Sequence, residues 1–265
     1  MCLKPVITLT TDFGSADTYV AQMKGVIFTI APQVRIVDVT HDVSPQDIAA
    51  GALALESVVE VFTGDTIHVA VVDPGVGGAR AAVALETQSG RRFVGPDNGI
   101  FTAVLERDPL RTAVKLTNPA YHRPCVSATF HGRDIFAPVA AHLANGTPLD
   151  QLGEPTGTLQ RLDLPVPVHQ GDTIEAHVIH VDRFGNLITD VTLDDMTGVN
   201  HHAVQLQIAG TTIDGIHRTF ADVSIGQPIA YIGSSGRLEI AVRHGSAART
   251  FNAMAGTRVL LLRKK

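Results

Sequence analysis

The first part of the chain alternates strand-like and helix-like segments, and this alternation is the strongest constraint on its fold. The order β-α-β-α-β predicts a mostly parallel central sheet that helices cover on both faces. Ser44, followed by Pro45, is a suitable N-cap for the second helix. The expected strands are Val6–Thr11, Val34–Val39, Thr66–Val72 and Ala81–Thr87, and the expected helices are Thr18–Ala31, Ser44–Val61, Gly99–Glu106 and Phe136–Asn145.

The composition and the pattern of the sequence change after Gly153. Glu154–Pro167 is rich in Pro, Thr and Leu, which is typical of a linker. Beyond Gly171, short alternating runs separated by turn residues predict a smaller all-β domain, a barrel or a sandwich. We therefore expect an α/β domain at residues 1–160 and a barrel-like domain at residues 170–265, with a ligand bound between domains or between subunits. The strands expected in the second domain are Thr173–Val181, Leu187–Val191, Ala203–Ile208, Thr211–Ile213, Pro228–Ile232, Leu238–Val242 and Thr257–Leu262.

Composition excludes several classes of function. The 265 residues carry a formal net charge of −5 and no block of Lys or Arg, so we expect no nucleic-acid partner. No apolar run approaches the length of a membrane span, and no secretory signal is recognisable, so a cytoplasmic protein is expected. Cys2 and Cys125 form no metal-type cluster and no HExxH motif is present, so no metal is expected.

Two carboxylates follow the first strand. Asp12 comes directly after Val6–Thr11, and Asp17 lies five residues further on, before the first helix. Open α/β sheets bind small molecules at the C-terminal ends of their strands, and carboxylates there suit a ligand with hydroxyls or an amine. The alternative interpretation is that one of them caps the following helix.

A second loop, DPGVGGAR, follows the third strand and carries Asp73 and Arg80. Its glycines allow the backbone to approach a ligand, but it lacks the ending of a phosphate-binding P-loop. A structural ion pair is the alternative interpretation. His131 lies before the last helix of the first domain, and its interest depends on whether Asp73 and Arg80 are its neighbours.

Two segments of the second domain have the residue types of a binding site. In HVDRFGN, Phe184 can stack on a base and Asn186 can read the edge of an adenine, although a β-bulge or turn would explain the segment equally well. In IGSSG, the hydroxyls of Ser234 and Ser235 and the exposed amides can hold a carboxylate, and a plain hairpin turn is the alternative.

Taken together, these segments resemble the S-adenosyl-L-methionine (SAM) hydroxide adenosyltransferases, or SAM hydrolases, which are relatives of the fluorinases and chlorinases. The resemblance extends over nearly the whole chain. Its motifs are TLTTDFG with YVAQMKGVI, THDVSPQDI, VVDPGVG with Arg80, GPDNGI, TFHGRDIFAP, VDRFGN and SSGRLEIAV, all in the expected order.

The resemblance implies an enzyme that hydrolyses SAM to adenosine and L-methionine by attack of water or hydroxide on the ribose C5′. It also implies a homotrimer in which SAM lies between the N-terminal domain of one subunit and the C-terminal domain of the next. No metal or other cofactor is implied, since SAM is the substrate. The catalytic residues would be Asp73, Arg80 and His131.

The resemblance also assigns contacts with the substrate. Asp12 matches the residue that holds the ribose diol, and Asp17 and Asp182 match carboxylates near the methionine ammonium. The adenine-binding positions are Phe184, Asn186 and Phe220, and the clamp on the methionine carboxylate is Ser234 and Ser235.

In the mechanism that we expect, Arg80 holds hydroxide and Asp73 orients the pair. His131 is then the natural proton acceptor near neutral pH, although an Asp base with a positioning His is also compatible with the sequence. The halogenating relatives have Arg where this chain has Ser235 and lack the Asp–Arg–His set, which disfavours halide transfer. A SAM- or adenosine-binding protein without turnover and a SAM-dependent halide transferase are the alternative functions.

Overall fold

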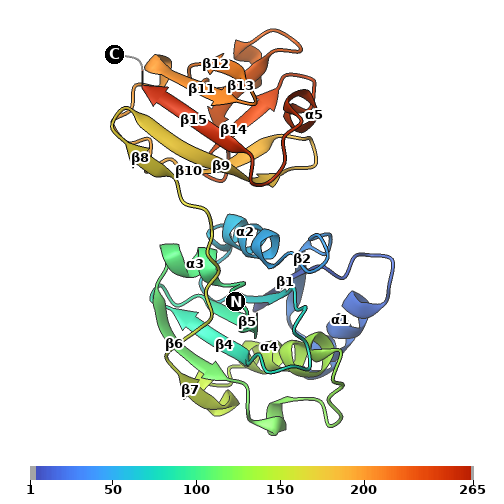
Figure 1. The fold of residues 1–265 in the computed structure, drawn as a ribbon. Coiled ribbons are helices and arrows are strands. Elements are labelled where there is room, and N and C mark those ends of the chain that lie inside the picture. Colours follow the sequence, from blue (N-terminus) through green and yellow to red (C-terminus); the bar gives the residue numbers. More distant parts are fainter. Residues whose placement is uncertain (1–3, 264–265) are drawn as a thin grey trace. The chain divides into compact units, whose positions relative to one another are not determined.

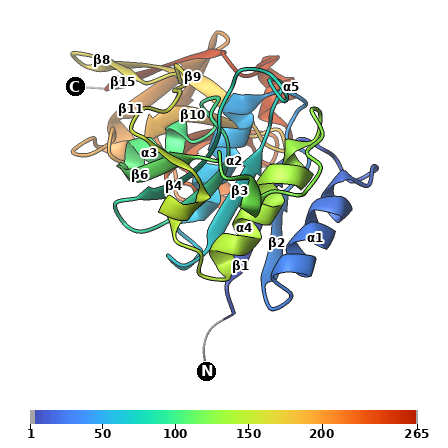
Figure 2. The same ribbon diagram turned by 90° about the horizontal axis from the view of Figure 1, so that it is seen from below.

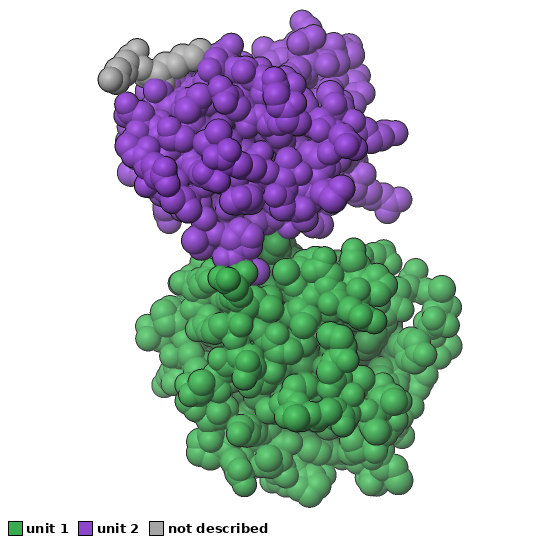
Figure 3. Space-filling model, in the orientation of Figure 1, with its two compact units in different colours: residues 1–163 green, residues 164–265 purple. Residues whose placement is uncertain are grey.

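The computed structural model describes residues 4–263, so Cys2 lies outside the described part of the chain. The chain divides into two compact units, residues 1–163 and residues 164–265, coloured green and purple in Figure 3. Each unit has its own hydrophobic core. None of the helices within residues 4–263 has the length and apolar character needed to span a bilayer.

Unit 1 is built on a seven-stranded sheet in the order β2-β1-β3-β5-β4-β6-β7 (Figure 1). Its strands are β1 (Val6–Thr11), β2 (Arg35–Thr40), β3 (Ile67–Val71), β4 (Ala82–Thr87), β5 (Arg92–Pro96), β6 (Leu110–Lys115) and β7 (Glu154–Thr156). Its helices are α1 (Tyr19–Ile30), α2 (Ile48–Val59), α3 (Thr102–Arg107) and α4 (Ala137–Ala144), with shorter helical turns at η1 (Pro119–Tyr121), η2 (Gly132–Phe136) and η3 (Leu149–Leu152).

The expectation of a mostly parallel sheet is wrong for half of unit 1, where the sheet is mixed. β2, β1, β3 and β5 are parallel neighbours, but β4, β6 and β7 pair antiparallel. The reason lies in the short connection between β4 and β5, where Gly90 has a φ of 88°. A parallel pair needs a crossover of a dozen or more residues, so a short turn of this kind forces a hairpin.

The boundaries of two segments also differ from expectation. α2 begins at Ile48, and its N-cap is Asp47, whose side chain accepts a hydrogen bond from the backbone of Ala50. Ser44 therefore lies outside the helix, because Gln46 has a φ of 68° and interrupts it. Glu154–Thr156, expected as linker, forms the edge strand β7 beside β6.

Helices cover both faces of the sheet, as expected from the alternating sequence. α1 and α4 pack together on one face, where Met23 and Ile27 enter a core with the apolar side of α4 (Figures 1 and 2). α2 and α3 pack on the other face, where Leu55 and Phe93 belong to a second core. β3 lies between these layers and is buried along its whole length, as a parallel strand covered by helices on both faces should be.

Unit 2 is an all-β unit whose sheet is nearly barrel-shaped. Eight strands belong to it, and along the sheet they follow the order β12-β11-β15-β9-β10-β14-β13, with β8 paired to β9. The two ends of this order approach each other, because β12 contacts β13. The strands are β8 (Val168–Gln170), β9 (Thr173–Val181), β10 (Leu187–Thr192), β11 (Val204–Ile208), β12 (Thr211–Asp214), β13 (Pro228–Ile232), β14 (Arg237–Val242) and β15 (Arg258–Arg263), with α5 (Ala247–Phe251) and the turns η4 (His201–Ala203) and η5 (Phe220–Asp222).

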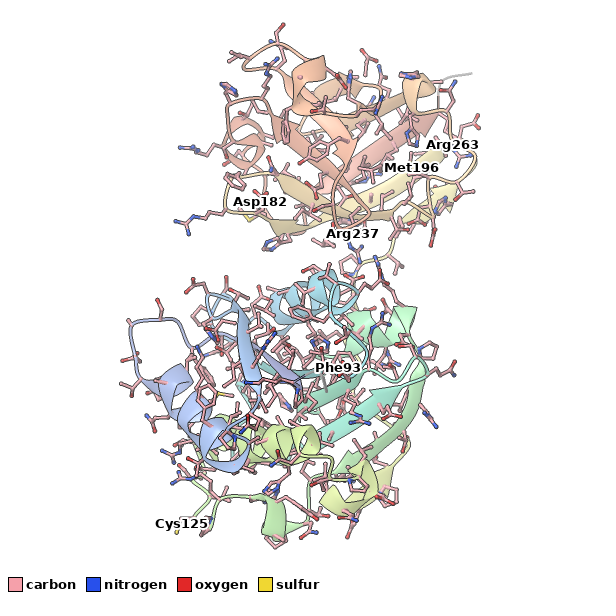
Figure 4. All side chains as sticks on the ribbon, turned by 180° about the vertical axis from the view of Figure 1, so that it is seen from behind. Phe93, Cys125, Asp182, Met196, Arg237 and Arg263 are labelled. Atoms are coloured by element: carbon pink, nitrogen blue, oxygen red, sulfur yellow. The ribbon has the colours of Figure 1, made fainter. Side chains whose placement is uncertain are left out.

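A histidine is buried in the core of unit 1. The His68 side chain on β3 is 0% exposed and forms a hydrogen bond of 2.8 Å with Thr8 through Nδ1. Its ring stacks on Phe93, which Figure 4 labels inside the unit, with centroids 5.2 Å apart. Burial, together with the charge of Arg91, lowers the pKa of His68 to about 4.

Two loops of unit 1 touch through a glycine. Gly77, in the loop after β3, has a φ of 75°, and a Cβ at this position would lie 2.2 Å from the backbone oxygen of Ala128. The loop after β3 can therefore approach the segment before η2 this closely only with glycine at position 77. The contact brings the loop that carries Asp73 and Arg80 against the segment that leads to His131.

We predict that His68 makes the protein sensitive to mild acid. Since the folded state depresses the pKa from 6.5 to about 4, the unfolded state binds a proton first as the pH falls. Between about pH 7.5 and about pH 5, this difference removes about 2 kcal/mol from the free energy of unfolding. Urea unfolding of wild type and His68→Gln at both pH values measures it. An equal pH dependence in the two proteins would contradict the prediction.

We predict that Gly77→Ala destabilises unit 1 by about 2 kcal/mol, because the new Cβ combines an unfavourable φ with a backbone clash. Gly64→Ala is the matched control, since nothing lies within 4 Å of a Cβ at that position. Chemical denaturation of both variants measures the difference. Equal stability of the two variants would show that the two loops separate at little cost.

Candidate functional site

Asp73, Arg80 and His131 form one contact network in unit 1. Arg80 donates from Nε to Oδ1 of Asp73 at 2.9 Å and from Nη2 to Oδ2, so the carboxylate is bound through both oxygens. The same Nη2 lies 2.8 Å from Nδ1 of His131. The side chains of Asp73 and Arg80 are 5% and 10% exposed, so this ion pair is largely shielded from water.

The elements that position these residues come from distant parts of the sequence. Asp73 follows β3, and Arg80 precedes β4 on the same glycine-rich loop. His131 precedes η2, a single turn of π-helix, which is a feature often found at functional sites. The guanidinium of Arg80 also lies over the ring of Phe136, 5.4 Å from its centroid, and this contact fixes its plane.

The hydrogen bond between Arg80 and His131 determines the tautomer of the ring. A guanidinium has donors but no acceptor, so Nδ1 of His131 must accept. In the neutral ring the proton is therefore on Nε2. Burial lowers the pKa of His131, and the charge of Arg80 lowers it further, against the opposing effect of the Asp73 and Asp134 carboxylates.

Asp134 anchors the segment that leads to His131. Its side chain is 0% exposed and accepts hydrogen bonds from the backbone of Ser127 at 2.9 Å, from Arg123 at 3.0 Å and from Arg133 at 2.7 Å. Burial opposes ionisation, but these hydrogen bonds outweigh it and lower the pKa of Asp134. Sequence analysis did not single out this residue, although an acid directly before the apolar helical run IFAPVAA was a usable signal.

A cavity of about 390 Å³ adjoins this network, and both Asp73 and His131 line it. Three aromatic rings pack against one another beside it: Phe130 lies 5.8 Å from Phe13 and 5.2 Å from Tyr19, between ring centroids. The remaining lining residues are Gln22, Val71, Val76, Ser127, Thr129, Gly132 and Arg133. The cavity thus combines apolar rings with polar and charged groups that can orient a ligand.

The two acids after β1 do not cap α1. The N-cap of that helix is Thr18, which makes no side-chain cap, and Asp17 is exposed in the preceding loop. Asp12 accepts a hydrogen bond through Oδ2 from the backbone of Gln46 at 2.8 Å. Within residues 4–263, its Oδ1 has no hydrogen-bond donor, and this oxygen is available to a ligand.

A second cavity, of about 820 Å³, lies in unit 2. All the site residues expected in that unit line it: Asp182, Phe184, Asn186, Phe220, Ser234 and Ser235. Sequence analysis missed Tyr231, Glu239, His244 and Arg249, which also line it. Glu239 stands alone as a charged residue in the apolar run LEIAV, which was a recognisable signal.

Asp182 organises the loop between β9 and β10, at the edge of unit 2 where Figure 4 labels it. Its Oδ1 accepts from the backbone of Phe184 at 2.9 Å and of Asn186 at 2.8 Å, and its Oδ2 accepts from the Asn186 side chain at 2.8 Å. Asn186 is therefore held in place and is only 8% exposed, whereas the Phe184 ring is 77% exposed. An exposed ring beside a fixed amide suits a planar heterocycle.

No group of three or more His, Cys, Asp or Glu side chains among the described residues is arranged to hold a metal ion. One acid in each cavity is instead engaged by a neighbouring side chain of its own unit: Asp73 by Arg80, and Asp182 by Asn186.

Curated relatives resemble the chain over almost its whole length. The (R)-S-adenosyl-L-methionine hydrolase of Thermus thermophilus is 42% identical over 271 residues, covering 98% of this chain and 100% of the relative. The hydrolase of the same name from Salinispora tropica is 40% identical over 276 residues, covering 98% of each chain. A fluorinase from an Actinoplanes species is more distant, at 30% identity over 295 residues, with 96% of each chain covered.

A solved structure has the same fold. The crystal structure of an uncharacterized conserved protein from Thermotoga maritima superposes with a TM-score of 0.92 at 33% sequence identity, covering 97% of this chain and 100% of that one.

Family comparison assigns both units. Residues 7–153 match the SAM hydroxide adenosyltransferase N-terminal domain, and residues 176–260 match the C-terminal domain of the same family. The chain belongs to the SAM hydroxide adenosyltransferase family.

Proposed function

We propose that this protein is an enzyme that hydrolyses SAM to adenosine and L-methionine. The family and the full-length relatives named as SAM hydrolases support the reaction. The observation that carries the proposal is the partly buried Asp73–Arg80–His131 network beside a cavity, because it offers hydrogen-bond donors to a small nucleophile.

The enzyme must mainly assist the nucleophile of this reaction. A sulfonium leaves as a neutral thioether, so no acid is required at the leaving group. Water is a weak nucleophile, and attack of hydroxide on C5′, in line with the departing sulfur, cancels charge in the transition state. A partly dry site favours such a step. The overall reaction consumes one water and releases one proton for each SAM.

The hydrogen bond from Arg80 supports a donor role for His131 rather than the role of proton acceptor. Nδ1 is occupied by Arg80, and Nε2 already carries the proton of the neutral ring. Asp73 is bound through both oxygens by the same guanidinium. The remaining donors are the Nε2–H of His131 and the Nη1–H groups of Arg80. We therefore propose that these groups bind hydroxide by charge-assisted hydrogen bonds.

The other residues would bind the substrate. The free Oδ1 of Asp12 suits the ribose diol, and Asp17 suits the methionine ammonium. In unit 2, Phe184, Asn186 and Phe220 suit adenine, and Ser234 and Ser235 suit the methionine carboxylate. We further propose a homotrimer in which neighbouring subunits complete each site, and a reaction without a metal. The cytoplasmic location stays a prediction from the sequence.

We predict that the purified protein releases adenosine and methionine from SAM, and that EDTA does not stop the reaction. Chromatography of the products measures both. Methylthioadenosine or S-adenosylhomocysteine as the product would refute the reaction. A 5′-halo-adenosine formed in the presence of chloride or fluoride would identify a halide transferase, and binding of SAM without any product would identify a binding protein.

We predict that His131→Gln retains much more activity than His131→Ala. Glutamine keeps an N–H donor but has no basicity, so a donor role predicts a kcat within about tenfold of wild type, while alanine loses about 100-fold or more. Steady-state kinetics of both variants, with adenosine affinity as the control for folding, measures the difference. A glutamine variant as inactive as the alanine variant would restore His131 as the base.

A further inference from the structure

The floor of the cavity in unit 2 is a row of three residues on neighbouring strands. Glu239 on β14 pairs directly with Ile188 on β10 and with Tyr231 on β13. Residues paired across antiparallel strands point to the same face of the sheet, and all three line the cavity of about 820 Å³. An acid therefore lies at the centre of this floor.

Only one oxygen of the Glu239 carboxyl group has a hydrogen-bond donor among the described residues. The residue is 9% exposed, and its Oε2 accepts a hydrogen bond from the hydroxyl of Tyr231 at 2.6 Å. Its Oε1 has no hydrogen-bond donor, and the side chain has no ion pair, within residues 4–263. Burial raises the pKa of Glu239, and the nearby carboxylate of Asp182 also acts in this direction, against the hydrogen bond from Tyr231.

The free oxygen lies next to the turn that carries the two serines. A Cβ at Gly233 would lie 1.8 Å from Oε1 of Glu239, so the absence of a side chain at Gly233 makes room for the carboxyl group. On the same turn, the Oγ atom of Ser235 is buried and has no hydrogen-bond partner among the described residues. Glu239 and Ser235 line the same cavity, which therefore has an anionic acceptor and a hydroxyl that both lack a partner among the described residues.

The Oγ atom of Ser235 is a buried polar atom without a partner, which is costly, and Oε1 of Glu239 is a carboxylate oxygen that no donor within residues 4–263 satisfies. The fold does not need an acid here, since its strand neighbour Ile188 on the same floor is apolar. A pair of free groups of this kind is therefore explained by a ligand that satisfies both. An acceptor that is anionic selects a cationic donor, and a hydroxyl can donate to a carboxylate. An amino-acid zwitterion has both groups on one carbon.

Asp182 is a poorer candidate for the cation. Its two oxygens already accept three hydrogen bonds from Phe184 and Asn186, which hold the loop between β9 and β10 together. It contributes negative charge to the cavity, but Oε1 of Glu239 is the carboxylate oxygen without a partner. The sequence motif thus suggests Asp182 as the partner of the cation, whereas the acid with an oxygen free to accept a hydrogen bond is Glu239.

We propose that Glu239 is a substrate-binding residue whose Oε1 accepts a hydrogen bond from the α-ammonium group of the methionine part of SAM, while Ser235 donates to the carboxylate. This assignment rests on the proposed function, since it takes SAM as the ligand. Tyr231 acts as a positioning residue, because its hydroxyl holds Oε2 and turns Oε1 toward the ligand. Glu239 thereby makes the enzyme selective for substrates with a free α-amino group.

The test compares Glu239→Gln with wild type on SAM and on the deamino analogue of SAM, in which hydrogen replaces the α-amino group. Glutamine keeps an acceptor for Tyr231 and nearly the same shape but loses the charge. We expect KM for SAM to rise about tenfold or more, with kcat within about twofold, because a hydrogen bond between charged groups is lost. KM for the deamino analogue should be the same in both proteins.

Glu175→Gln is the matched control, because Glu175 lies on β9 of the same unit and forms an ion pair with Arg258 outside the cavity. It should leave KM for SAM unchanged. Equal losses on SAM and on the analogue, or a weaker affinity for adenosine in Glu239→Gln, would show a merely structural role and overturn the proposal. Tyr231→Phe should raise KM for SAM less than Glu239→Gln does.

Calorimetric titration separates this proposal from the proposed function. If wild type binds SAM but releases no adenosine, hydrolysis is refuted, and the affinities of wild type and Glu239→Gln for SAM still test the role of Glu239. If the Glu239→Gln protein does not fold, the wild-type protein alone can still overturn the proposal. It should then bind SAM about tenfold or more tightly than the deamino analogue, and equal affinities would overturn the proposal.

Discussion

The guanidinium of Arg80 holds the N-terminal site together, because it donates at once to Asp73 and to His131. These residues come from a loop after β3 and from the start of a π-helical turn, so no local structure would bring them together. Loss of Arg80 would leave a shielded carboxylate without its counter-charge, a situation that is strongly destabilising. The contact of Gly77 with Ala128 and the anchoring of the segment before His131 by Asp134 serve the same geometry.

The same interaction limits the chemistry that each group can perform. A histidine that accepts from an arginine keeps its proton on the other nitrogen, and a carboxylate bound on both oxygens has little capacity to take a proton. The three side chains together are therefore better suited to hold an anion than to create one from bound water. A neutral His131 is favoured by its burial and by the neighbouring positive charge, both of which lower its pKa.

Sequence reasoning predicted those features that depend on local patterns. The strand Val6–Thr11 and the buried run of β3 were predictable because long apolar periodicity decides them. Strands β5 and β6, and with them the antiparallel pairing of β4, were not predicted, because a hairpin turn with a single glycine was outweighed by the alternation of strands and helices around it. Glu239 was not predicted as a site residue for a different reason. Its environment depends on the register of β14 with β10 and β13, which a single sequence does not specify.

The two units use acids in opposite ways. In unit 1, the charge of Asp73 is cancelled by Arg80 at hydrogen-bond distance, so the network has little net charge and offers donors. In unit 2, Glu239 is buried with only a neutral hydroxyl as partner, and Asp182 adds to the negative potential. SAM has two cationic centres and one carboxylate, so an acid without a counter-charge attracts SAM. An acid that is paired with a cation, such as Asp73, does not compete with the nucleophile for SAM. The environment of Asp73 is thus suited to holding a small anion, and that of Glu239 to holding a cation.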